Sequence, residues 1–322
     1  NMGAPTPGAA PASPVPALPL FFGLVVLAVL ALGWLTTRPA TTEAARNERF
    51  GWRLLAPALV LMAGLGGAPL VLTFAQATLD LDLRQPWRGA PFVGARLLQD
   101  ALTEPRFLQA ALHTLAFTVI SVGLELLLGL ALALALNRAF RGRGLVRGAA
   151  LVPWAIPAVV GAILWRFLFD TLAPDVAWNG DATLAWVPVI VADVWKTTPF
   201  VALLLLAGLS QIDPALFEAA DMDGASARDR LWHIVLPLLR PAMLVALLFR
   251  TLDALRVFDL IFVMTGGGPG TATEVLSVVA HDTMMRDLRI GAGAAMSAII
   301  FGASLVLALI YVRVVGEREA AP

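Results

Sequence analysis

The sequence predicts an all-α protein that crosses a membrane several times. Hydrophobic residues make up 59% of its 322 residues and charged residues 14%, and the mean hydropathy is +0.80. A soluble globular domain is roughly 45–50% apolar, so this composition lies outside the usual range. Several apolar runs also exceed the roughly 18 residues that indicate a membrane-spanning helix. Composition and run length therefore both predict a polytopic helical membrane protein.

Seven apolar runs are predicted to span the membrane. An additional first helix at residues 19–35 precedes a six-helix core, whose spans are expected at residues 54–74, 108–136, 148–169, 184–209, 242–264 and 290–312. The residues before the first helix are rich in Ala and Pro and are expected to be disordered. Four regions follow: a tail at 1–18, the additional helix and a cytoplasmic linker at 19–53, the core at 54–314 with a cytoplasmic loop at 211–241, and a cytoplasmic tail at 315–322.

A cleaved signal peptide is the alternative explanation for the first apolar run. Signal peptides have basic residues before their apolar stretch. This run has no basic residue before it, whereas Arg38, Arg46 and Arg49 follow it. We therefore expect a helix that is retained.

The distribution of arginines predicts the orientation of the spans, because cytoplasmic loops are enriched in basic residues. Arginines cluster after the first, third and last spans and in the loop at 211–241: Arg38, Arg46, Arg49, Arg53, Arg138, Arg141, Arg143, Arg147, Arg228, Arg230, Arg240, Arg313 and Arg318. Residues 170–183 are acidic and contain no basic residue. We expect the N-terminus outside and the C-terminus in the cytoplasm.

Composition excludes several classes of function. The chain has no cysteine, which excludes disulfides, thiolate metal sites and cysteine nucleophiles, and its three histidines are too scattered to form a metal cluster. A net charge of zero gives no signature of nucleic-acid binding. The only lysine, Lys196, follows no glycine-rich turn, so the chain has no Walker A loop. We expect no enzymatic activity, metal or cofactor, and any ATPase must be a separate chain.

Residues 211–241 are a polar, helix-forming island between two apolar runs. Asp213 suits an N-cap, and Pro214 suits the first helical position because its missing N–H needs no partner there. A short helix is therefore predicted from Pro214 to Asp223. Gly224 ends it, because glycine adopts the left-handed conformation without steric cost.

A second helix is predicted to follow in the same island. Ser226 and Asp229 form a capping box at its start, and Pro237 is expected to end it after Leu236. The two helices would form a helix–turn–helix bracket on the membrane surface that docks a partner. Its small and acidic candidate contact residues are Glu218, Ala219, Ala220, Asp221, Asp223 and Gly224.

Charged residues within the fifth core span recur at intervals of three. The segment FRTLDALRVFD contains four charges of alternating sign, so consecutive members would be neighbours on one helix. Each charge at mid-membrane costs roughly 2.5–3.5 kcal/mol on insertion scales, so the four must pair or face a cavity. Two interpretations stay open at this point: a polar wall of a translocation pathway, or structural ion pairs. The four are Arg250, Asp253, Arg256 and Asp259.

The fourth core span contains the second polar group, ADVWKTTPF. Pro199 frees the carbonyl of Trp195, and such interruptions are tolerated where the backbone is buried in protein or lines water. Trp195 and Phe258 supply aromatic faces beside the charged residues. Together the two spans give the candidate substrate-pathway residues Asp193, Trp195, Lys196, Arg250, Asp253, Arg256, Phe258 and Asp259.

The polar island resembles the "EAA" coupling loop of ATP-binding-cassette importer permeases. That pattern consists of EAA, a glycine and I-x-L-P, which stand here as Glu218-Ala219-Ala220, Gly224, and Ile234, Leu236 and Pro237. Residues 52–314 also resemble, in order, the permease subunits of sugar importers of the maltose-transporter type. The motifs are LALALNR, VPWAIP, DVWKTTPF, the EAA loop, LLFRTLDALRVFD and TGGGPG, and they extend over about four-fifths of the chain.

The resemblance implies a half-permease in the bacterial inner membrane. It implies a second, similar permease subunit, two copies of an ATP-binding subunit and an extracytoplasmic sugar-binding protein as partners, with membrane lipid around the spans. The bracket would transmit closure of the ATPase dimer to the core spans. The resemblance to sugar permeases also implies a neutral oligosaccharide as substrate, such as the α-linked disaccharides trehalose or maltose. The charges at the candidate site sum to about zero, which favours a neutral substrate over a strongly anionic one.

Two other classes of function stay open. An ion-coupled secondary transporter would use Asp193, Asp253 or Asp259 to bind a proton or cation, although it would not need a single cytoplasmic bracket. A membrane scaffold without a transport path is the other class. Copurification with an ATPase, and the dependence of uptake on ATP or on an ion gradient, separate the three.

Overall fold

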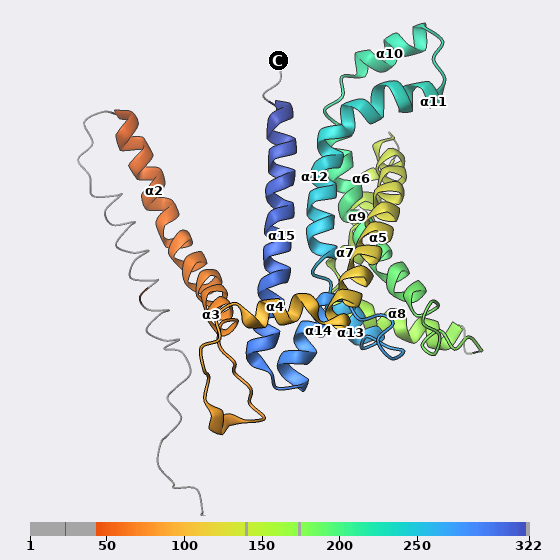
Figure 1. Ribbon diagram of the computed structural model, residues 1–322. Helices are drawn as coiled ribbons and strands as arrows, with labels where there is room; N and C mark the ends of the chain where they lie inside the picture. Colours follow the sequence, from red (N-terminus) through yellow and green to blue (C-terminus); the bar gives the residue numbers. More distant parts are fainter. Residues whose placement is uncertain (1–22, 24–42, 139–140, 173–174, 320–322) are drawn as a thin grey trace, which may run out of the picture. The chain divides into compact units, whose positions relative to one another are not determined.

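The computed structural model describes residues 23, 43–138, 141–172 and 175–319, which are mainly helical (Figure 1). The predicted tail and the first predicted span lie outside these residues, apart from Gly23. The described part contains five helices that are long and apolar enough to cross a membrane, and a bent pair of helices is a sixth candidate. These correspond in order to the six predicted core spans, and the all-α polytopic fold is confirmed.

The chain divides into two compact units. One comprises Asn1–Thr103 and Ala280–Ile299, and the other comprises Glu104–Val279 and Ile300–Pro322. The second unit contains the loop at 211–241 and all eight candidate substrate-pathway residues.

The first unit contains the first core span, the loop that follows it, and a later segment that includes the start of the last core span. Its elements are α2 (Glu43–Met62), the π-helix η1 (Ala63–Gly67), α3 (Ala68–Gln76), η2 (Pro86–Arg88), α4 (Arg96–Thr103), η4 (Asp282–Arg286) and the start of α15 (Ile290–Glu319). The candidate span Leu54–Gln76 matches the span predicted at 54–74. Gly291 permits a close approach of the loop to α15, because a Cβ added there would lie 2.0 Å from the Leu79 oxygen.

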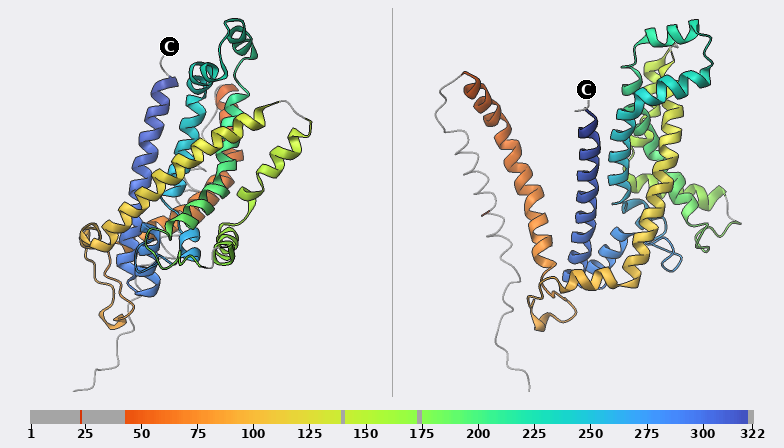
Figure 2. Two further views of the ribbon diagram at one scale, coloured as in Figure 1. Left: turned by 90° about the vertical axis from the view of Figure 1, so that its right-hand side faces the viewer. Right: turned by 45° about the horizontal axis from the view of Figure 1, so that its top comes forward.

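The second unit is built on α5 (Pro105–Asn137) and α9 (Trp186–Leu209). Between them come α6 (Arg143–Ala150), α7 (Val152–Ala155) and α8 (Ala158–Leu172); after them come α10 (Pro214–Met222), α11 (Ala227–Arg230), η3 (Leu231–Val235), α12 (Leu236–Ala254), α13 (Asp259–Met264) and α14 (Leu276–His281). Figure 2 shows α10 and α11 as a helical hairpin at one end of α12.

Small residues bring the long helices of the second unit together. Gly129 of α5 lies against Val201 of α9, and Gly208 of α9 lies against Ala242 and Leu239 of α12. Val201 and Leu239 belong to one cluster of buried apolar side chains, which also contains Leu205 and against which Ala242 packs, and a second cluster contains Ile261. In membranes such small residues let helix backbones approach closely, and the gain in packing stabilises the pair.

We expect Gly129→Ala to destabilise the protein. The added methyl carbon would lie 2.6 Å from Cγ1 and 2.9 Å from Cβ of Val201, and overpacking of this kind costs about 1–3 kcal/mol. The thermal midpoint of the purified protein should fall. Gly123→Ala on the same helix is the control, because no heavy atom lies within 4 Å of its added methyl carbon. Equal midpoints for the two variants would contradict the close contact.

The sequence predicted one straight helix at residues 148–169 for the third core span, and this prediction was wrong. The helices Arg143–Ala155 and Ala158–Leu172 meet at an angle of 90°. Pro157 lies at the bend, where it lacks the N–H that a continuous helix would need and its ring would clash with the preceding turn. The third core span therefore consists of two helical segments with a bend between them.

The fifth core span also differs from the prediction at residues 242–264. Its candidate span is Ala227–Ala254, so the second bracket helix continues into the membrane and the prediction that Pro237 ends it was wrong. Pro237 lies in the first turn of α12, directly after the π-helix η3. A first-turn proline loses little hydrogen bonding, and the wider π turn accommodates its ring. At the other end the helix stops at Ala254, and α13 is a separate short helix.

Candidate functional site

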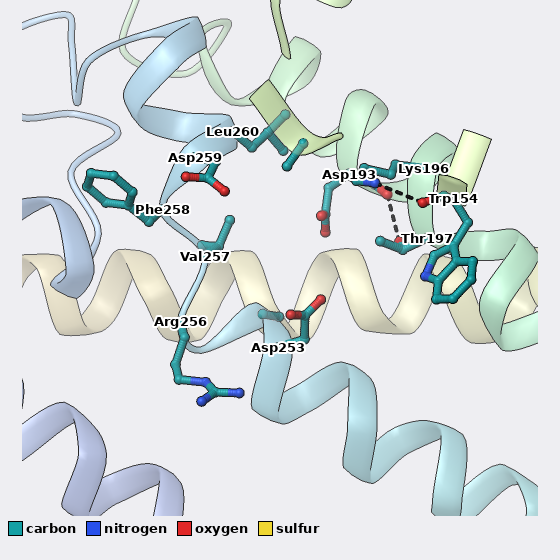
Figure 3. A pocket seen from close by; sticks show the side chains of 12 residues that line it. Trp154, Asp193, Lys196, Thr197, Asp253, Arg256, Val257, Phe258, Asp259 and Leu260 are labelled. Carbon is teal, nitrogen blue, oxygen red and sulfur yellow. Dashed lines mark hydrogen bonds between the residues drawn. The ribbon is translucent and has the colours of Figure 1, made fainter. Parts of the chain in front are cut away.

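A pocket of about 270 Å³ lies in the second unit where α7, α8, α9, α12 and α13 meet (Figure 3). Six of the eight candidate substrate-pathway residues line it: Asp193, Lys196, Asp253, Arg256, Phe258 and Asp259. Trp154 and Thr197 line it as well. The pocket therefore combines charged, hydroxyl and aromatic side chains on elements that lie far apart in the sequence.

Arg250 lies behind the pocket and makes ion pairs with three carboxylates. Its side chain is 3% exposed and pairs with Glu125, Asp193 and Asp253. Its Nη2 donates to Glu125 Oε1 at 2.8 Å and to Asp193 Oδ2 at 3.2 Å. The guanidinium thus connects α5, α9 and α12, and a buried charge of this kind is tolerated because it is fully paired.

Glu125 was not among the predicted site residues. It is completely buried in α5, and its partner is 125 positions away in the sequence. A signal was present, because Glu125 is the only acidic residue in the apolar run 108–136. A lone carboxylate in such a run costs insertion energy and must have a partner or a functional role.

Only the first two of the four charges predicted at intervals of three lie on one helix. Arg250 and Asp253 are neighbours on α12, but the helix ends at Ala254, and Arg256 lies in the link that follows. The Arg256 Nε donates to the Leu252 carbonyl at 3.2 Å. Asp259 lies in the first turn of α13. Because the helix is interrupted, the four charges do not form one helical stripe, and Arg256 and Asp259 line the pocket from the link and from α13.

The aromatic wall of the pocket differs from the predicted pair of Trp195 and Phe258. Trp195 contacts Trp165 edge to face, with ring centroids 5.6 Å apart, and does not line the pocket. Trp154 takes its place, and its ring stacks on Phe200 at 5.5 Å. The bend at Pro157 brings Trp154 to this position. The straight helix predicted from the sequence gave no reason to expect Trp154 in the pocket.

Lys196 does not pair with Asp193, although the sequence placed the two charges together. Its ammonium donates to the Trp154 carbonyl at 3.1 Å and to the Ile156 carbonyl at 2.5 Å. Asp193 pairs with Arg250 instead. Including Glu125, the group contains four acidic and three basic side chains, a formal charge of minus one instead of the predicted sum of about zero.

The bracket at 211–241 has the predicted local geometry. Asp213 accepts a hydrogen bond from the Ala215 N–H at 2.9 Å and caps α10. Gly224 has φ of +72°. Ser226 and Asp229 form a reciprocal capping box at the start of α11. Hydrogen bonds from the Ser226 hydroxyl and N–H also hold the pKa of the Asp229 carboxyl below its ordinary value.

Most of the predicted contact residues of the bracket are exposed. Glu218, Ala219, Asp223 and Gly224 are exposed and Ala220 is half-buried. Asp221 is exposed but pairs with Arg230 at 2.5 Å. This pair joins α10 to α11, so Asp221 has a bracing contact within the bracket. The role of these six residues in docking a partner stays a prediction.

Comparison with known proteins gives consistent matches. Residues 125–318 match the family described as binding-protein-dependent transport system inner membrane component. The trehalose/maltose transport system permease protein MalF of Thermococcus litoralis is 39% identical over 84% of this chain and 94% of its own length. The trehalose transport system permease protein SugA of Mycobacterium tuberculosis is 39% identical over 86% of this chain and 91% of its own length.

A solved structure has a similar fold. The crystal structure of a bacterial alginate ABC transporter in complex with an alginate pentasaccharide-bound periplasmic protein contains a chain that matches with a TM-score of 0.67. The two chains are 20% identical, and the match covers 84% of this chain and 94% of the other.

Proposed function

The chain belongs to the family of binding-protein-dependent transport system inner membrane components, and we propose that it is the transmembrane subunit of an ATP-driven carbohydrate importer. It forms half of the translocation pathway for a di- or oligosaccharide. The observation that carries this proposal is the 39% identity to trehalose permeases over 84% and 86% of the chain. Nearly the whole length of each relative is included, so the likeness is not limited to one motif.

The chemistry of the pocket supports a neutral sugar. Carboxylates and cationic side chains can accept from and donate to sugar hydroxyls, and Trp154 and Phe258 offer apolar faces to the ring. The group around the pocket has no excess of cationic side chains, which disfavours an anionic substrate. We therefore propose a neutral disaccharide, with trehalose or maltose as the first candidates because the two relatives carry these names.

The bracket supports coupling to a separate ATPase. Its exposed acidic and small residues form a compact projection on α10 and the turn that follows. Closure of an ATPase dimer against α10 would move α11 and α12 together, because these helices are continuous through η3. A second permease subunit, two ATP-binding subunits and an extracytoplasmic binding protein complete the proposed assembly. We place the C-terminus in the cytoplasm and the N-terminus outside.

Uptake by the reconstituted complex tests the proposed function. The chain is coexpressed with its partner permease, ATPase and binding protein and is placed in liposomes containing ATP. We expect uptake of labelled trehalose or maltose that requires ATP and the binding protein and persists without an ion gradient. A labelled sugar phosphate and a labelled amino acid serve as comparison substrates.

Two results would contradict the proposal. Uptake that needs an ion gradient and no ATP would identify a secondary transporter. ATP-dependent uptake of the sugar phosphate or the amino acid, with no disaccharide transported, would reject the substrate assignment while retaining the importer.

A further inference from the structure

The bend in the third core span leaves two backbone carbonyls without helical partners. In a continuous helix each carbonyl accepts from the N–H four residues later. Pro157 and the 90° bend interrupt this pattern after α7. Within the described part of the chain, no backbone N–H donates to the carbonyl of Trp154 or of Ile156.

Lys196 of α9 supplies the missing donor for both carbonyls. Its Nζ lies 3.1 Å from the Trp154 oxygen, drawn as a dashed line in Figure 3, and 2.5 Å from the Ile156 oxygen. Cations are favoured beside the terminal carbonyls of a helix. An ammonium has three donors on a flexible stem, so this one side chain can donate to both carbonyls.

The same helix also holds the side chain of Trp154. Phe200 lies four residues after Lys196 on α9, and its ring stacks on Trp154 with an interplanar angle of 14°. Residues four apart on a helix occupy one face. One face of α9 therefore makes two contacts with Trp154: Lys196 donates to its carbonyl, and Phe200 stacks on its indole ring.

We propose that Lys196 is a positioning residue, which holds the bend at Pro157 so that the ring of Trp154 forms the sugar-stacking wall of the pocket. This rests on the proposed function. The sequence suggested a different role, in which Lys196 contacts the substrate with its charge. In the structure its ammonium is bonded to the backbone, and Trp154 is the group that it presents to the pocket.

A double-mutant cycle distinguishes the two roles. Lys196→Met keeps the apolar stem and removes the donors, and Trp154→Ala removes the ring. If Lys196 acts only through Trp154, each single variant should raise the KM of sugar uptake by about tenfold, and the double variant should be no worse than Trp154→Ala alone. Lys196→Arg, which keeps charge and donors, should recover most of the affinity. Additive losses in the double variant would show that Lys196 contacts the sugar directly and would overturn the proposal.

A second measurement does not depend on sugar transport. Because the chain contains no cysteine, Ala158→Cys in the pocket lining gives a single thiol next to the bend. Its rate of labelling by a water-soluble maleimide should change in the Lys196→Met background and stay as in the parent in the Lys196→Arg background. Asp175→Cys, at an exposed position, should label equally in all backgrounds.

These readouts separate failure of the proposal from failure of the proposed function. If the parent complex transports no sugar, the labelling comparison still tests whether Lys196 holds the bend. If Lys196→Met does not fold, Lys196→Leu replaces it in both experiments, because leucine also lacks a hydrogen-bond donor. Recovery of labelling and affinity by Lys196→Arg, together with a changed labelling rate in the donor-free variant, supports positioning by hydrogen bonds. Equal labelling rates for the parent, Lys196→Arg and the donor-free variant would overturn the proposal.

Discussion

Arg250→Met is expected to cause a severe loss of folded, membrane-inserted protein. The substitution leaves Glu125, which is completely buried, and Asp193, whose side chain is 12% exposed, without their cation. Breaking a buried ion pair by removing one partner typically costs about 3–5 kcal/mol, which is a large part of the stability of most proteins. The yield of monodisperse protein after detergent extraction and its thermal midpoint are the measurements.

Removing the partner charge as well should restore part of this loss. In the double variant Arg250→Met and Glu125→Leu, the fully buried carboxylate is replaced by an apolar side chain of similar volume. We expect its midpoint to lie between those of the parent and Arg250→Met. Asp253→Asn should be mild, because the Asp253 side chain is 71% exposed and solvent weakens its ion pair. A double variant that is less stable than Arg250→Met would show that Glu125 has another essential partner.

Glu218→Arg is expected to abolish ATP-dependent uptake without unfolding the protein. Glu218 is exposed on α10, so reversal of its charge leaves the fold intact but removes a central contact of the proposed ATPase interface. A hot-spot residue is worth about 2 kcal/mol or more, so uptake should fall roughly 30-fold or further. Copurification with the ATPase should fall with it, while the binding protein still binds sugar.

Two further variants define the cause of that loss. Asp175→Arg makes the same change of charge at another exposed acid and should leave uptake unchanged. Gly224→Val should also uncouple transport, because the φ of +72° at Gly224 is strained for a β-branched residue. If Glu218→Arg retains both uptake and ATPase association, the assignment of the bracket as a docking site is wrong.

Local patterns predicted much of the fold. The spans predicted at 108–136, 184–209 and 290–312 match α5, α9 and α15 closely. A run of about 20 apolar residues is enough to indicate a membrane-spanning helix, so no contact with distant residues is needed for the prediction. The bracket was predicted for a similar reason. Its caps at Asp213 and Ser226 and its turn at Gly224 involve residues that are at most five positions apart.

The candidate site could be predicted only in part. Five charged pocket residues were identified because polar side chains within apolar runs are conspicuous, and Phe258 was identified as an aromatic residue beside them. Glu125, the most deeply buried of the three partners of Arg250, and Trp154, an aromatic residue of the pocket wall, were missed. Their roles depend on the contact of α5 with α9 and on the bend at Pro157. A proline in an apolar run indicates a possible break but not its direction.

The sequence by itself determined the all-α membrane fold, the order of the spans and the helix caps of the bracket, because hydropathy and capping act between residues that are near in the chain. Only the tertiary structure decided which charges pair and which side chains reach the pocket. Close helix packing, as at Gly129 and Val201, brings together carboxylates and cations that are more than fifty positions apart. Burial makes each of these groups dependent on its partner, and so the three-dimensional contacts determine their roles.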